Sequence, residues 1–252
     1  NIQCSSKKKT TPLQRIIYRC RKGFNAYKTR FAVFGFRYCE VSADDLSDLE
    51  DAEFTAVAVY SDLRRTGFFK SSNALLDQFV ESTVWSARSN FLDIPTDCPT
   101  RERHGWTGDA QIFFDTAGWL FDCASFFRKY VQDMYDWQRK DGCLPQIVPE
   151  GGVDFYMDAM NGSVGWADAG VLIPYRFWKR YGDRSILEKY YKGMKKYARF
   201  MMKRCGKHTL LSKPLRIPHG YRKYAVIAGQ SYGEWAEPAD VHPNKWTDMV
   251  LP

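Results

Sequence analysis

Acidic side chains that could act together in acid–base chemistry lie between residues 93 and 115, in the segment DIPTDCPTRERHGWTGDAQIFFD. The segment also holds two prolines and two glycines, namely Pro95, Pro99, Gly105 and Gly108. Proline opposes a helix at its own position and just before it, and glycine allows backbone conformations or close approaches that other residues resist. Asp97, Arg101, Glu102 and Arg103 are therefore expected on a shaped loop.

The helix expected after this loop would carry a further carboxylate. Thr107 has a side chain suited to an N-cap, which would place Asp109 in the first turn, where exposed amides and the helix dipole favour a negative charge. Asp97 and Glu102 would then precede the helix. Paired carboxylates can hydrolyse a glycosidic bond, one as the proton donor and, in inverting enzymes, one as the base that activates water roughly 6.5–9.5 Å away.

The spacing of these charges also allows other interpretations. Ion-pair networks are common outside active sites, and Arg101 and Arg103 would lower the pKa of an acid that must stay protonated. Cys98 could be a thiol nucleophile, but it would need a positioned histidine, and His104 is a weak candidate. Cys98 is therefore interpreted as a small packing residue.

The run DCPTRERHGWTGDA, residues 97–110, resembles the catalytic segment of the bacterial α-L-rhamnosidases of glycoside hydrolase family 78. The resemblance implies that Glu102 is the general acid and that Asp97 and Asp109 bind the sugar. It also implies that Trp106 lines the rhamnose pocket. Arg101, in the same run, is included among the expected substrate-binding residues.

Two shorter segments downstream resemble further parts of the same family's site. The run GWADA, residues 165–169, is similar to the second aromatic segment, which implies substrate contacts from Trp166 and Asp168. The run YGEW, residues 232–235, is similar to the Gly-acidic-Trp segment and adds Trp235.

The water-activating base is the role that the sequence leaves unassigned. In the family it is a glutamate on a later part of the barrel, and none of the loop glutamates Glu150, Glu234 and Glu237 matches its motif. The resemblance implies an inverting hydrolase that removes terminal α-L-rhamnose from a rhamnose-containing glycoside, with no metal and no cofactor. Two alternatives stay open: a sugar-binding fragment that lacks the base, and another (α/α)6 glycosidase with a different sugar.

Composition narrows the class of partners. The net charge of +8 raises the question of nucleic acid, but the basic residues are spread and no nucleic-acid motif accompanies them, so none is expected as a partner. No apolar run is long enough to cross a membrane. The seven cysteines are scattered without a C-x-x-C pair, which favours a reducing, cytoplasmic compartment. The sequence also allows a homodimer.

Residues 1–60 are predicted to contain β-strands. Residues 16–18, 31–41 and 54–60 are rich in β-branched and aromatic residues, with partial alternation. The segment resembles the last strands of the β-sandwich that precedes the catalytic domain in these rhamnosidases. We predict that residues 1–60 end a β-sandwich and form a linker strand, and that residues 61–252 begin a catalytic barrel.

The apolar period becomes that of helices after residue 71. Helices are predicted over residues 72–89, 109–121, 124–139, 166–181 and 184–204, the first capped by Ser71 or Ser72. The second is expected to turn Ile112, Phe113, Ala117 and Leu120 inward. Helical hairpins joined by long loops such as 141–165 indicate an α/α toroid, and the resemblance implies a mainly α, (α/α)6 six-hairpin barrel. These helices would make about half of it, so we expect the chain to be a fragment.

Overall fold

The computed structural model describes residues 14–150, 161–206, 224 and 226, and this part of the chain is mainly helical. Its helices are η2 (Leu46–Leu49, a 3-10 helix), α1 (Ala74–Asn90), α2 (Thr107–Leu120), α3 (Ala124–Asp136), α5 (Ala169–Tyr181) and α6 (Ser185–Arg204). The predicted helices are thus confirmed, with ends that differ by a few residues. None of the helices among the described residues is long and apolar enough to cross a membrane.

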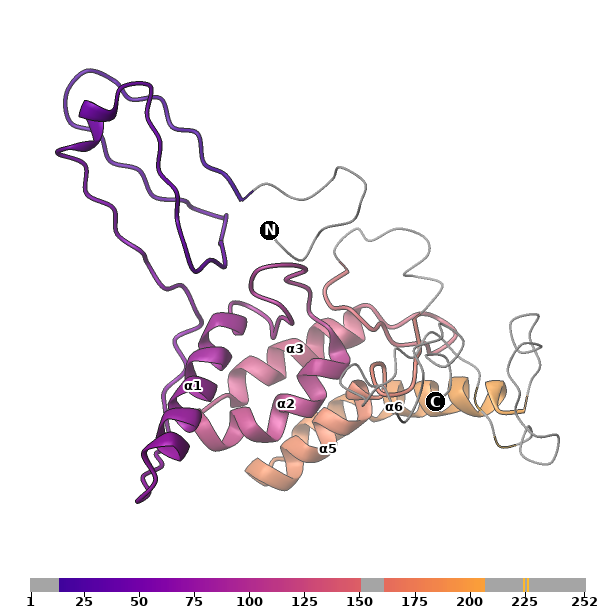
Figure 1. The fold of residues 1–252 in the computed structure, drawn as a ribbon. Coiled ribbons are helices and arrows are strands. Elements are labelled where there is room, and N and C mark those ends of the chain that lie inside the picture. Colours follow the sequence, from indigo (N-terminus) through magenta and orange to yellow (C-terminus); the bar gives the residue numbers. More distant parts are fainter. Residues whose placement is uncertain (1–13, 151–160, 207–223, 225, 227–252) are drawn as a thin grey trace, which may run out of the picture.

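The helices form two hairpins, α2–α3 and α5–α6, and α5 packs against the first hairpin. A short turn joins α2 to α3, and Gly182, in a left-handed conformation with φ of 69°, ends α5 before α6 begins. Helix α5 packs against α2, α3 and α6 (Figure 1). Residues near the starts of α2 and α5 contact one another, and so do Gly118 and Arg180 near their ends. The two helices therefore run in the same direction, and both begin at the same end of the molecule.

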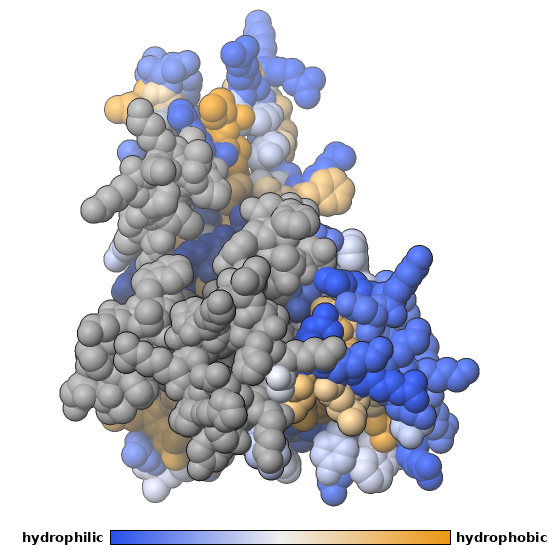
Figure 2. All heavy atoms as spheres, turned by 90° about the vertical axis from the view of Figure 1, so that its right-hand side faces the viewer, coloured by the Kyte–Doolittle hydropathy of each residue, from blue (hydrophilic) through white to orange (hydrophobic). Residues whose placement is uncertain are grey.

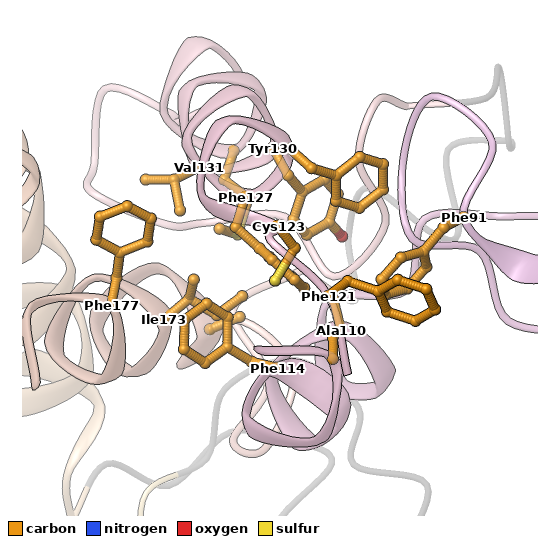
Figure 3. Packing of buried hydrophobic residues seen from close by; sticks show 14 of the residues in the cluster. Phe91, Ala110, Phe114, Phe121, Cys123, Phe127, Tyr130, Val131, Ile173 and Phe177 are labelled. Atoms are coloured by element: carbon orange, nitrogen blue, oxygen red, sulfur yellow. The ribbon is translucent and has the colours of Figure 1, made fainter. Parts of the chain in front are cut away.

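Aromatic rings fill the space between these helices (Figure 3). Phe127 of α3 is fully buried and makes edge contacts with Phe91 and Phe114, at ring-centre distances of 6.0 and 4.7 Å. Phe114 in turn lies 6.5 Å from Phe177 of α5. Edge-to-face pairs of this kind add to the stability gained from burial alone, so the rings fix α2, α3 and α5 against one another.

Helix α2 turns most of the predicted residues inward, since Ala117 is fully buried and Phe113 and Leu120 pack against the core, but Ile112 is an exception. Ile112 is 72% exposed, whereas Phe114 is fully buried. Apolar residues occur on several sides of this helix, so their spacing did not define a single register. Its small residues Ala110, Ala117 and Gly118 decide the buried face because they allow close approach of the neighbouring elements.

Helix starts also differ from the predicted caps. Asn73, rather than Ser71 or Ser72, caps α1, because its side-chain oxygen accepts hydrogen bonds from the amides of Leu75 and Leu76. Thr107 is the first residue of α2 and not its cap. Its hydroxyl donates instead to the carbonyl of Gln146, 3.1 Å away, so a loop contact replaces the cap.

The predicted strands are not formed in the described part of residues 1–60, which is extended chain apart from η2. A strand exists only where neighbouring segments share a ladder of hydrogen bonds, and residues 14–60 form no such ladder in the described part of the chain. Its apolar side chains are accordingly exposed, among them Ile17, Phe24, Phe31 and Tyr38. The N-terminal segment lies at the top of Figure 1, and the top of Figure 2 shows hydrophobic residues at the surface.

Candidate active site

The loop before α2 closes on itself through Asp97. The backbone amide of Asp97 donates to the carbonyl of His104 at 3.1 Å, and the amide of His104 donates to Asp97 Oδ1 at 3.0 Å. Within this ring the amide of Arg103 donates to the Cys98 carbonyl, and Arg103 adopts a positive φ of 53°. Asp97 therefore shapes the loop on which Glu102 lies.

A second loop holds the end of this one in place. The amide of Val148 donates to the carbonyl of Gly105 at 2.8 Å, and the hydroxyl of the buried Tyr130 in α3 donates to the same oxygen at 2.8 Å. A Cβ at Gly105 would lie 1.9 Å from the Val148 carbonyl oxygen, so only glycine permits this approach. The beginning of the long loop 141–165 thus supports the start of α2.

The N-terminal extended segment contacts the other side of the loop. The guanidinium of Arg103 donates to the carbonyl of Val33, and a Cβ at Gly35 would lie 2.6 Å from the carbonyl oxygen of Pro99. The side-chain amide of Gln14 donates to the carbonyl of Thr100 at 3.2 Å. The loop is therefore held between the N-terminal segment and the helices.

The carboxyl group of Glu102 has the surroundings of a proton donor. The indole N–H of Trp106 donates to Glu102 Oε2 at 2.9 Å. The residue is exposed overall, but the protein atoms around its carboxyl group exclude part of the water, and this desolvation raises its pKa. The negative charge of Asp97 raises the pKa further, whereas the hydrogen bond from Trp106 lowers it. The net direction is upward, which favours the protonated form.

Asp109 lies in the first turn of α2, as predicted. Desolvation raises its pKa, and its backbone environment at the helix start opposes that effect. The charges of Asp97 and Glu102 raise the pKa of Asp109 as well. The structure thus brings the three predicted carboxylates of this segment within electrostatic reach of one another.

Cys98 and Arg101 lie beside these carboxylates. Arg101 Nη2 lies 3.2 Å from Cys98 Sγ, and desolvation raises the pKa of the Cys98 thiol to about 11. Ligand atoms of Asp97, Cys98 and Glu102 lie within 4.8 Å of one another, the one such group among the described residues. A thiol that keeps its proton is a poor nucleophile, so the raised pKa does not favour a nucleophilic role for Cys98.

Trp166 reaches the start of α2 from the loop before α5. A Cβ at Gly108 would lie 2.9 Å from the indole ring of Trp166, so the ring lies directly against the glycine backbone next to Asp109. Because Gly108 has no side chain, the half-buried indole of Trp166 fits beside the carboxylates. The structure thus brings Trp166 beside the carboxylates, and its contact with substrate stays a prediction.

Asp168 uses both carboxylate oxygens within the protein. Its Oδ2 accepts from the amide of Gly165 at 2.8 Å, and its Oδ1 accepts from the hydroxyl of Tyr197 in α6 at 2.8 Å. The side-chain amide of Gln111 donates to the Gly165 carbonyl at 3.3 Å. The sequence did not place Tyr197 or Gln111 near the site. Both lie on buried helix faces, where the apolar pattern gives no signal for such contacts. Trp235 lies outside the described residues.

Comparison with known proteins identifies the family of this arrangement. The family model described as the bacterial alpha-L-rhamnosidase six-hairpin glycosidase domain matches residues 64–251. The chain belongs to this family. The six-hairpin fold class predicted from the sequence is thereby confirmed, and the described helices make up part of that domain.

Several rhamnosidases are similar to the chain in sequence. An alpha-L-rhamnosidase of Formosa agariphila is 38% identical over 181 residues, which cover 70% of this chain and 19% of the relative. One of Streptomyces avermitilis is 35% identical over 167 residues, or 66% of this chain and 16% of the relative. The chain therefore spans less than a fifth of the length of these rhamnosidases.

Solved structures of rhamnosidases resemble the described fold. The alpha-L-rhamnosidase from Dictyoglumus thermophilum has a TM-score of 0.53 and 36% identity over 57% of this chain and 16% of that one. The Streptomyces avermitilis enzyme complexed with L-rhamnose has a TM-score of 0.54 and 34% identity over 57% of this chain and 14% of that one. The similarity to rhamnosidases thus extends from the sequence to the arrangement of the helices.

Proposed function

We propose that the chain supplies the general acid and part of the sugar pocket of an α-L-rhamnosidase, which removes terminal α-L-rhamnose by an inverting mechanism. The observation that carries the proposal is the position of Glu102. Its carboxyl group accepts a hydrogen bond from Trp106 and has a raised pKa because of desolvation and the neighbouring Asp97. The family membership supplies the substrate class.

Glu102 acts by donating its proton to the glycosidic oxygen as the bond to the anomeric carbon breaks. Protonation lets the aglycone leave as a neutral alcohol, and positive charge develops on the sugar ring. A carboxyl group whose pKa is raised keeps its proton at higher pH than an ordinary glutamic acid, so it can act as an acid nearer neutrality. The Trp106 N–H fixes one carboxyl oxygen, which directs the other towards the leaving group.

The remaining site residues hold the sugar. Asp97 and Asp109 lie close enough to Glu102 for their charges to interact with it. Both side chains accept hydrogen bonds from rhamnose hydroxyls. Trp106 and Trp166 offer flat apolar surfaces to the sugar's C–H faces, and Arg101 donates hydrogen bonds at the pocket edge. Asp168 and Trp235 complete the set predicted from the sequence, although both oxygens of Asp168 already accept hydrogen bonds from the protein.

Inversion requires a second carboxylate that activates water on the opposite face of the sugar. Among the loop glutamates, Glu150 is exposed, and Glu234 and Glu237 lie outside the described residues. We assign the base to a part of the protein beyond this chain, in agreement with the small share of each relative's length that the chain covers.

The test is hydrolysis of p-nitrophenyl α-L-rhamnoside by the full-length protein, with the released sugar followed by NMR. The proposal predicts that the wild type first releases β-L-rhamnose and that Glu102→Gln loses activity. Release of α-L-rhamnose would contradict inversion. A folded wild type that binds L-rhamnose without hydrolysing the rhamnoside would replace the proposed enzyme with a sugar-binding protein.

Three further proposals concern the whole protein. Residues 1–60 would pair with further strands to complete a β-sandwich, which would cover the exposed aromatic side chains of this segment. A cytoplasmic location rests on the scattered cysteines. A homodimer is the third, and sedimentation of the full-length protein would test it.

A further inference from the structure

A chain of hydrogen bonds links helix α6 to the loop that carries Trp166. The hydroxyl of Tyr197, a residue only 3% exposed, donates to Asp168 Oδ1 at 2.8 Å. Asp168 Oδ2 accepts from the amide of Gly165 at 2.8 Å, and the carbonyl of Gly165 accepts from Gln111 of α2 at 3.3 Å. The turn at Gly165 is thus held from two helices at once.

The geometry of this turn decides where Trp166 lies. Gly165 has a φ of 84°, a conformation that favours glycine and that reverses the chain immediately before Trp166. The indole ring then rests on Gly108, where an added Cβ would lie 2.9 Å from it. Ala167, the next residue, is 1% exposed. The ring therefore has packed backbone behind it and the carboxylates of α2 beside it.

We propose that Asp168 and Tyr197 are positioning residues that hold Trp166 against Gly108, so that the aromatic wall of the sugar pocket is set by helix α6. Each carboxylate oxygen of Asp168 accepts from a protein donor, so this side chain joins the Gly165 turn to helix α6. The inference rests on the proposed function for its sugar ligand. It assigns Tyr197, a residue outside the motifs that resemble the family, to the binding of substrate.

The test compares Tyr197→Phe with Tyr190→Phe in the full-length protein. Both tyrosines lie on α6 and are almost fully buried, and the hydroxyl of Tyr190 donates to Gln132 Oε1 at 2.6 Å, away from the site. Each variant loses one hydroxyl, so a loss of stability is common to both. Because the lost partner of Tyr197 is a carboxylate, we expect Tyr197→Phe alone to raise KM about tenfold with little change in kcat.

Two further variants separate positioning from direct contact. Asp168→Asn should raise KM to the same extent as Tyr197→Phe, and the double variant should be no worse than either single one. Gly108→Ala leaves the hydrogen bonds intact but pushes on the ring, so it should also raise KM. An Asp168→Asn variant that loses sugar binding while Tyr197→Phe resembles Tyr190→Phe would overturn the proposal and make Asp168 a direct ligand.

Hydrogen exchange in the absence of sugar tests the network independently of catalysis. Peptides that cover residues 161–168 should exchange faster in Tyr197→Phe and Asp168→Asn than in the wild type and in Tyr190→Phe. Equal exchange in all four proteins would overturn the proposal. If the wild type hydrolyses no rhamnoside, the proposed function fails, but the exchange result still decides whether Tyr197 holds this turn.

Discussion

Two neighbours of Glu102 act on its pKa in opposite directions. Desolvation and the charge of Asp97 raise the pKa, whereas the indole N–H of Trp106 lowers it by stabilising the charged form. A general acid works only while protonated, so activity is lost as the pH rises through this pKa. The high-pH limb of the pH profile of kcat/KM therefore reports the pKa of Glu102, which these opposing effects set.

Two substitutions should move that limb in opposite directions. Asp97→Asn removes a negative charge and lowers the pKa of Glu102, so the limb should move to lower pH. Trp106→Phe removes the hydrogen bond and raises the pKa, so the limb should move to higher pH. The measurement is kcat/KM against pH for each variant beside the wild type. Shifts in the same direction for both would show that the limb belongs to another group.

The residues that carry charge in the site could be predicted from the sequence, because Asp97, Glu102 and Asp109 lie close together along the chain. The roles that depend on distant partners could not. Asp168 was predicted to bind sugar, and its contact with Tyr197 joins residues far apart in sequence. A buried tyrosine on an amphipathic helix has the same pattern whether its hydroxyl bonds to a carboxylate or to a neutral amide.

Helices with one clear apolar stripe were predicted more accurately than those with several. In α3 the apolar residues Phe127, Tyr130, Val131 and Met134 recur at helical spacing, and all four are buried. In α2 the apolar residues surround much of the helix, so glycine and alanine contacts determined the register. The prediction of strands in residues 1–60 was wrong for the described part of this segment, because strand formation depends on a partner strand and not on propensity alone.

Helix α3 should depend strongly on its buried aromatic face. Phe127→Ala removes a fully buried ring that contacts Phe91 and Phe114, and it should lower the free energy of unfolding by about 3–5 kcal/mol. Ser125→Ala, at an exposed position of the same helix, should change it by less than about 0.5 kcal/mol. Chemical denaturation followed by helical circular dichroism measures both. Equal effects would contradict the described packing.

At the scale of the molecule, large apolar surfaces are exposed in the described part of the chain. Leu75, Phe79 and Trp85 of α1 are more than half exposed, as are several aromatic residues of the N-terminal segment. Surfaces of this kind usually mark an interface. We propose that further hairpins of the full-length protein cover this surface, because the chain spans less than a fifth of the length of its relatives.

The isolated chain should therefore lack rhamnosidase activity, because no water-activating base is assigned within it. The measurement compares p-nitrophenyl α-L-rhamnoside hydrolysis by this chain and by the full-length protein at equal concentration. Turnover by the isolated chain at the full-length rate would refute this prediction and place the base within residues 1–252.

The role of Glu102 is tested most directly by the dependence of hydrolysis on the leaving group in full-length Glu102→Gln. A lost proton donor should cost about a hundredfold to ten-thousandfold with a poor leaving group, such as an alkyl alcohol. With 2,4-dinitrophenolate, which departs without protonation, the loss should largely disappear. An equal loss on both substrates would contradict the assignment of Glu102 as the general acid.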